Sequence, residues 1–117
     1  MTLTLALSYG GRQEILKTVQ QIATKILSGE LRVVDIDHSV FESFLQTNSL
    51  PEPDLLIRTS GEMRISNFLL YQIAYTELYY TKVLWPEFKE DDLLHAIIDF
   101  QKRERRFGMT QEQIIKT

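Results

Sequence analysis

Apolar and polar positions follow two different rhythms along this chain. Residues 3–8 form a short apolar run that ends at paired glycines, Gly10 and Gly11, which predicts a strand and its turn. Apolar residues then recur at spacings of three and four between Ile15 and Leu27, which predicts a helix with one apolar stripe. Because a buried strand normally has neighbours on both sides and this chain offers few other strands, we also expect a missing partner, either another chain or absent sequence.

Two further strands are predicted in the middle of the chain. Residues 54–59 have the apolar centre that is typical of a strand buried on both faces of a parallel sheet. Residues 77–81 fit a third strand, although their periodicity leaves a helix open. Between them, Ser66 is placed to cap a helix that runs through residues 68–73. Strands that alternate with helices predict an α/β fold, here a partial parallel sheet flanked by helices.

Capping signals mark two more helices. A short helix is expected to begin between Asp37 and Ser39, because Ser39 and Glu42 have capping-box spacing. The last helix is expected to start near Lys89 and to stop near Gly108, with acidic residues at its start and basic residues at its end, as the helix dipole favours. These residues are Glu87, Glu90, Asp91 and Asp92 at the start, and Lys102, Arg103, Arg105 and Arg106 at the end.

The composition narrows the class of protein without indicating a function. A chain of 117 residues has the size of one domain, and its net charge of -3 argues against a nucleic-acid partner. The absence of cysteine excludes disulfides and thiolate metal sites. No apolar run approaches the roughly 18 residues of a membrane span. The first residues lack a signal-peptide pattern, so a cytoplasmic location is the default expectation.

The segment from residue 57 to residue 67 carries the clearest candidate chemistry. Arg58 and Arg64 flank a loop containing Gly61, and Ser66 follows at the predicted helix start. Arginine forks, a hydroxyl and a helix N-terminus suit an anionic phosphate, and sites in parallel sheets lie beyond the carboxyl ends of strands. A surface loop with solvated charges and an ordinary serine cap fits the same residues. The residues alone leave both interpretations open.

Glu77 is the second candidate, because it interrupts an apolar run from residue 73 to residue 80. A carboxylate in such surroundings is costly unless it is paired or bound to metal. A metal or an arginine partner is one interpretation, and a carboxylate at a strand edge facing water is the other. His38 and His95 have no zinc-type spacing, so neither is predicted to be a ligand.

Several motifs in order along the chain resemble those of undecaprenyl diphosphate synthases, which are cis-prenyltransferases. The first is Ser-Tyr-Gly-Gly-Arg at residues 8–12, and the second is Asp-Leu-Leu-Ile-Arg-Thr-Ser-Gly-Glu at 54–62, continuing as Arg-Ile-Ser-Asn-Phe-Leu-Leu at 64–70. The third begins with Ala-Tyr at 74–75, runs through Glu-Leu-Tyr at 77–79 to Leu-Trp-Pro-Glu-Phe at 84–88, and closes with Arg-Glu-Arg-Arg-Phe-Gly at 103–108. The match spans nearly the whole chain, and the second motif with its continuation is the specific one. The resemblance implies the C-terminal half of a cis-prenyltransferase fold.

The resemblance also implies a reaction and roles for particular residues. In this family, isopentenyl diphosphate condenses repeatedly onto an allylic diphosphate, usually farnesyl diphosphate, with the help of Mg²⁺. Arg58, Arg64 and Ser66 would hold the diphosphate of isopentenyl diphosphate, and Glu77 would support the magnesium site. The Arg106–Gly108 tail motif would reach the active site of a partner subunit. The resemblance further implies a homodimer formed through residues 66–85, with membrane association through the lipid product only.

One departure from the family matters most. The family's amino-terminal part carries a metal-binding aspartate in an Asp-Gly-Asn-Gly-Arg loop, and no such motif occurs in residues 1–117. We therefore expect this chain to be the isopentenyl diphosphate-binding half of an enzyme that makes polyprenyl diphosphate for lipid-carrier and cell-wall synthesis, and to be inactive alone. The alternative is a non-catalytic subunit of a heteromeric cis-prenyltransferase, which lends its tail to a catalytic partner.

Overall fold

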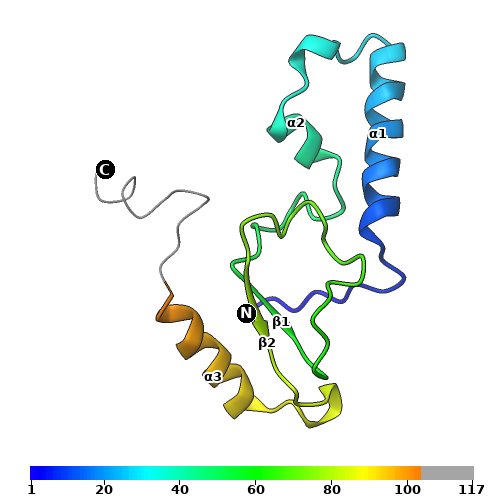
Figure 1. The fold of residues 1–117 in the computed structure, drawn as a ribbon. Coiled ribbons are helices and arrows are strands. Elements are labelled where there is room, and N and C mark those ends of the chain that lie inside the picture. The colour runs from blue at the N-terminus through cyan, green and yellow to red at the C-terminus, as the bar shows by residue number, and fades with distance from the viewer. Residues whose placement is uncertain (104–117) are drawn as a thin grey trace, which may run out of the picture. The chain divides into compact units, whose positions relative to one another are not determined.

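The computed structural model describes residues 1–103, which form two compact units. Unit 1 comprises residues 1–52 and 66–71. Unit 2 comprises residues 53–65 and the chain from residue 72 onward. Helices and a small parallel sheet together make an α/β protein, as the sequence predicts (Figure 1).

The longest element of unit 1 is helix α1, Gly11–Leu27, which confirms the helix predicted from the apolar spacing. Its buried positions are Gly11, Glu14, Thr18 and Ile22, which follow one another at steps of three and four along one face. The apolar stripe is only partly covered, because Leu16 remains 61% exposed. The face that packs inside unit 1 is therefore more polar than the sequence pattern suggests.

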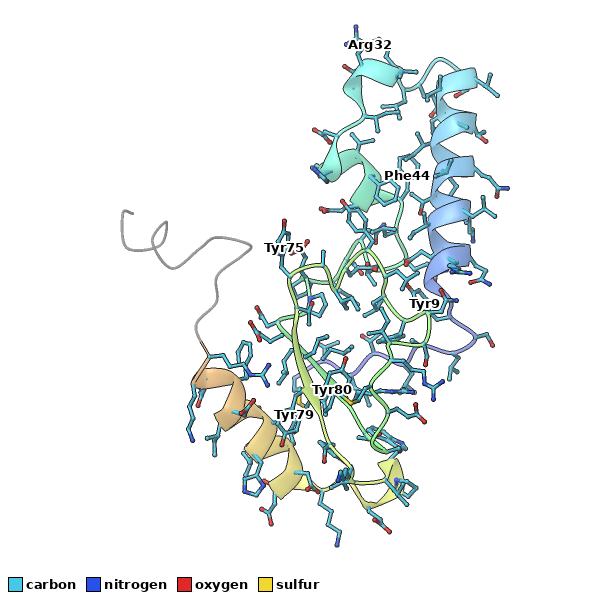
Figure 2. The ribbon with its side chains drawn as sticks, in the orientation of Figure 1. Tyr9, Arg32, Phe44, Tyr75, Tyr79 and Tyr80 are labelled. Carbon is cyan, nitrogen blue, oxygen red and sulfur yellow. The ribbon has the colours of Figure 1, made fainter. Side chains whose placement is uncertain are left out.

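Two short helices follow α1 in unit 1. The chain turns through a 3₁₀ helix, Val33–Asp35, into helix α2, His38–Ser43. Asp37 caps α2, because its side chain accepts a hydrogen bond of 2.8 Å from the amide of Val40. The predicted start of the helix between Asp37 and Ser39 is therefore confirmed, but the cap is Asp37 and not the predicted capping box at Ser39. Phe44 lies between α2 and α1 in Figure 2, and its carbonyl accepts a hydrogen bond from Thr18.

The strand predicted for residues 3–8 does not form. Leu3, Leu5 and Leu7 are 79%, 72% and 82% exposed, and the segment has no strand geometry. A strand requires a hydrogen-bonded neighbour, and within residues 1–103 the only sheet consists of two later strands. The apolar pattern of residues 3–8 therefore does not by itself make them a strand.

Unit 2 contains the parallel sheet. Strands β1, Leu55–Arg58, and β2, Glu77–Tyr80, pair in parallel, with Leu55 opposite Glu77 and Arg58 opposite Tyr80. The positions of both strands confirm the sequence prediction, but the burial expected for residues 54–59 is not seen, because every residue of β1 is only half-buried. After a 3₁₀ helix at Trp85–Glu87, helix α3, Glu90–Gln101, packs on β2 and buries Ala96 completely.

Helix α3 begins where the sequence predicts, near Lys89, but it ends earlier than predicted. Its acidic first turn is present, and the side chain of Asp92 accepts a hydrogen bond of 2.9 Å from the amide of Lys89. The helix ends at Gln101 with Lys102 as its C-cap, so the expected basic last turn is absent from α3 itself. The predicted stop at Gly108 lies outside the described residues.

The helix predicted through residues 68–73 is also absent. Ser66, Asn67 and Leu69 have left-handed backbones, with φ of 49°, 63° and 47°, and the segment forms successive turns. Left-handed residues cannot continue a right-handed helix, and each such non-glycine residue costs on the order of 1–3 kcal/mol. Ser66 therefore does not cap a helix, and the predicted helical amides near it are not available to a phosphate.

Candidate functional site

Arg58 lies at the edge of the sheet where parallel sheets commonly bind ligands. It is the last residue of β1, at the carboxyl end of the strand. Within the described part of the chain, its Nε is buried and has no hydrogen-bond partner. A buried guanidinium donor without an acceptor is unfavourable, and such a group in a native fold points to an acceptor that binds there, such as an ion or a ligand.

The loop after Arg58 is held in place by its backbone. Ser60 and Gly61 both have left-handed φ values of 67°, and their amides donate to the carbonyls of Val83 and Thr81 at 2.8 and 2.9 Å. The turn between the two arginines is therefore tied to the chain that leaves the carboxyl end of β2. A side chain at Gly61 would point toward Lys82, whose Cγ is 3.9 Å from the ideal Cβ position.

Lys82 is a cation that sequence reasoning missed. It follows the end of β2 by two residues, and the parallel register brings the carboxyl ends of β1 and β2 to the same sheet edge. The signal that could have identified it was a lysine just beyond a predicted strand end. Lys82 adds positive charge to the neighbourhood of the glycine turn.

Arg64 is exposed and already has an anionic partner. Its Nε donates to Oε2 of Glu62 at 2.6 Å, and the two side chains are 74% and 37% exposed. The hydrogen bond and charge of Arg64, with a smaller effect of the Arg58 charge, lower the pKa of Glu62. Such exposed pairs are weak, so a dianionic ligand could displace the Glu62 carboxylate from Arg64.

Ser66 belongs to unit 1, whereas Arg58 and Arg64 belong to unit 2. The two arginines lie at the two ends of one loop of unit 2. Ser66 is the first of the left-handed residues that pack in unit 1. The convergence of all three side chains on one diphosphate stays a prediction.

Asn67, next to Ser66, contacts the start of α1. Its carbonyl accepts from the amide of Gly11 at 2.7 Å, and its Oδ1 accepts from the amide of Arg12 at 2.8 Å. Asn67 therefore acts as the cap that Gly10, the residue preceding α1, has no side chain to provide. Sequence reasoning missed this role, because the two partners are 55 residues apart.

Glu77 has the arginine partner that its apolar surroundings predict. Nη1 of Arg103 donates to Oε2 of Glu77 at 3.0 Å, and the two side chains are 32% and 27% exposed. Because Glu77 begins β2, it lies at the opposite end of the sheet from Arg58. The register separates them by three residue steps, or about 10 Å along the strands. Unit 2 therefore does not bring Glu77 and Arg58 to one point.

The described residues do not by themselves fit a magnesium site. Magnesium prefers several oxygen ligands in octahedral geometry. No group of three histidine, aspartate or glutamate side chains gathers around one point within residues 1–103. Glu77 offers a carboxylate that is already bonded to Arg103. Arg106 and Gly108, predicted to reach a partner's site, lie outside the described residues.

Comparison with known proteins identifies the family. The fold is α/β with a parallel sheet, and residues 1–108 match the undecaprenyl diphosphate synthase family of prenyltransferases, so the chain belongs to that family. It is 59% identical over 114 residues to an isoprenyl transferase of Geobacter sulfurreducens, covering 97% of this chain and 46% of that protein. It is 53% identical over 114 residues to a farnesyl-diphosphate-specific ditrans,polycis-undecaprenyl-diphosphate synthase of Vibrio cholerae, with the same shares covered.

A solved structure agrees with the sequence relatives. Lavandulyl diphosphate synthase from Lavandula x intermedia, determined in complex with dimethylallyl diphosphate, superposes with a TM-score of 0.86 at 49% identity. The match covers 89% of this chain and 45% of that one. The chain thus spans less than half the length of these relatives. In addition, none of the helices among residues 1–103 is long and apolar enough to cross a membrane.

Proposed function

We propose that this chain is the isopentenyl diphosphate-binding part of a cis-prenyltransferase. The observation that carries the proposal is the buried Nε of Arg58, which has no acceptor in the described structure and stands at the carboxyl end of β1. Arg64, across the glycine turn, supplies a second fork that is exposed to an incoming anion. Two guanidinium groups are well suited to the oxygens of a diphosphate.

The reaction proposed for the whole enzyme is the condensation of isopentenyl diphosphate with an allylic diphosphate such as farnesyl diphosphate. The Vibrio cholerae relative is named for farnesyl diphosphate and for an undecaprenyl product. By this likeness, the product would be a polyprenyl diphosphate for lipid-carrier and cell-wall synthesis. The role of Arg58, Arg64 and Ser66 would be to hold and orient the nucleophilic substrate.

Magnesium and the partner subunit complete the proposal. Glu77 would contribute its carboxylate to the magnesium site, and further ligands would come from outside the described residues. Arg106 and Gly108 would act in the active site of a second copy, within a homodimer formed through residues 66–85. Exposed apolar side chains in that stretch support the dimer, among them Tyr75 at 63% and Leu84 at 51% exposure.

The chain alone is expected not to elongate a prenyl chain. Positioning of both substrates and the metal supplies most of the catalysis of such reactions, and residues 1–117 lack the Asp-Gly-Asn-Gly-Arg loop. An assay with farnesyl diphosphate, labelled isopentenyl diphosphate and magnesium should yield no long product. Clear turnover would contradict this expectation. A non-catalytic subunit remains the second candidate, but such a subunit would not need Arg58, Arg64 and Ser66.

Isothermal titration calorimetry of the chain with isopentenyl diphosphate tests the binding proposal. Arg58→Ala and Arg64→Ala should each weaken binding by about tenfold or more, since hydrogen bonds to charged groups contribute about 1.5–3 kcal/mol. Arg32→Ala is the matched control, because Arg32 is 75% exposed, lies in unit 1 and bonds only Asp35 among the described residues. Equal affinities for all three variants would refute the assignment.

A further inference from the structure

Helix α1 receives its cap from a distant part of the chain. The first amides of a helix have no partner within the helix, and the residue before α1, Gly10, has no side chain to serve them. Asn67 accepts hydrogen bonds from two of these amides, those of Gly11 and Arg12, through its carbonyl and its Oδ1. The cap thus fixes both the backbone and the side chain of Asn67.

Close packing around this cap allows Asn67 little freedom. Nδ2 of Asn67 donates to Oε1 of Gln13 at 3.1 Å, so both ends of its amide are held. A Cβ on Gly10 would lie 2.9 Å from Nδ2 of Asn67, and one on Gly11 would lie 3.1 Å from its carbonyl oxygen. The next residue, Phe68, meets the ring of Tyr9 edge to face, with centroids 5.6 Å apart. Tyr9, which is labelled in Figure 2, immediately precedes these glycines in the sequence.

Ser66 shares a peptide with Asn67, and both residues have left-handed backbones. Such a conformation persists only where surrounding contacts impose it. The contacts that impose it here are those of Asn67 with residues 11–13. The direction of the Ser66 side chain therefore depends on the cap that Asn67 provides.

We infer that Asn67 is a positioning residue for diphosphate binding: by capping α1, it holds the Ser66 hydroxyl in the orientation that the diphosphate of isopentenyl diphosphate requires. This inference rests on the proposed function. The paired glycines fit this cap, because Gly10 leaves room for the side chains of Asn67 and Gln13, and Gly11 leaves room for the Asn67 carbonyl. The two amides that Asn67 occupies are not themselves the anion site.

A double-mutant cycle with isopentenyl diphosphate as the probe tests the inference. Asn67→Gly removes the side-chain cap and keeps a residue that tolerates the left-handed backbone. In the otherwise unchanged chain it should weaken binding by about tenfold, the cost of one hydrogen bond to a charged group. In a Ser66→Ala background it should weaken binding by less than about twofold, because the hydroxyl it positions is gone.

Asp37→Gly is the matched control, because it removes the cap of α2 instead of that of α1. It should leave the affinity within about twofold of the unchanged chain, as expected for a cap that contacts no ligand group. Hydrogen exchange gives a second readout: Asn67→Gly should speed exchange at the amide of Arg12, which bonds the Asn67 side chain, and Asp37→Gly at the amide of Val40.

The outcomes separate this inference from the proposed function. If Asn67→Gly weakens binding no more than Asp37→Gly, or weakens it equally with and without Ser66, the positioning role is refuted. Arg58→Ala would then still weaken binding if the proposed function is correct. If the unchanged chain does not bind isopentenyl diphosphate, or Arg58→Ala binds as well as it does, both are overturned.

Discussion

Arg103 bonds to Glu77 across the two elements that pack together in unit 2. Nη1 of Arg103 donates to Glu77 at 3.0 Å and to the carbonyl of Leu78 at 2.8 Å, while its Nε donates to Asp99 at 2.9 Å. These bonds connect the end of α3 to the start of β2. The hydrogen bonds of Glu77 and Asp99 raise the pKa of Arg103, so its charge is permanent in the folded protein.

Removing the Arg103 guanidinium should destabilise the chain. Arg103→Met leaves the half-buried Glu77 carboxylate and the Leu78 carbonyl without this donor. The expected loss is about 1–2 kcal/mol in the free energy of unfolding, reduced from the cost of a fully buried pair because solvent reaches both side chains. Arg103→Lys should recover only part of it, because a single ammonium cannot reproduce the fork.

Urea unfolding followed by circular dichroism measures this effect. Arg32→Met provides the control, since Arg32 and Asp35 form an exposed pair at 75% and 43%. Its unfolding midpoint should change little. If the Arg103 and Arg32 variants lose the same stability, the connection between α3 and β2 contributes less than its geometry indicates.

Gly11 should not tolerate a methyl group. Its added Cβ would lie 2.7 Å from Cγ of Leu70, too close for any real contact. We expect Gly11→Ala to cost about 1–3 kcal/mol of stability through overpacking. This outcome opposes helix propensity, which alone would favour alanine by about 1 kcal/mol.

Gly29→Asn is the comparison for Gly11→Ala in thermal unfolding. Nothing lies within 4 Å of a Cβ at Gly29, and asparagine tolerates its φ of 76°. The melting temperature of Gly29→Asn should therefore stay near that of the unchanged chain. A Gly11→Ala variant that is more stable than the unchanged chain would show that Leu70 does not pack against the helix start.

Tyr71 should ionise at a higher pH than a free tyrosine. Desolvation, and then the charge and hydrogen bond of Glu42, raise its pKa above the ordinary value of 10.0. Its hydroxyl also lies 3.0 Å from Nδ1 of His38, and its ring packs on Phe41. Because the folded state holds the phenol proton more tightly than the unfolded state, stability is retained below pH 10 and falls as the pH rises through the folded pKa.

A titration of ¹³C-labelled tyrosine by NMR, with Tyr71→Phe for assignment, follows this proton. Glu42→Gln should move the pKa of Tyr71 back toward its ordinary value. Glu52→Gln should move it less, because the charge of Glu52 is the smallest of the causes. A Tyr71 that ionises below a free tyrosine would contradict the contacts described for its hydroxyl.

Self-association is expected through the exposed apolar side chains after β2. Trp85 is 72% exposed and Leu84 is 51% exposed, and surfaces of this kind favour association. Light scattering at micromolar concentration should show a dimer, and Leu84→Glu should shift it toward the monomer. Leu16→Glu changes an exposed leucine of α1 and should have a smaller effect. A monodisperse monomer of the unchanged chain would refute the predicted interface.

Local patterns were sufficient to predict much of this fold. Helix α1 and both strands were predicted at nearly their observed bounds, because the period of apolar residues differs between a helix and a strand. The buried face of α1 was not predicted, since Glu14 and Thr18 are buried there while Leu16 is exposed. The start of α3 was predicted from its acidic first turn. The arginines and the serine of the candidate site came from a motif with local turn chemistry, which needs no knowledge of distant contacts.

Only the tertiary structure decided which distant segments form hydrogen bonds and ion pairs with one another. Residues 3–8 form no strand, since hydrogen-bonded pairing depends on a neighbour that an apolar run does not specify. Residues 66–69 leave helical geometry because Asn67 bonds the start of α1, and no local signal announces a cap supplied from 55 residues away. The apolar setting of Glu77 predicted that it needs a partner. That this partner is Arg103 depends on the packing of α3 against β2, which brings the two side chains together.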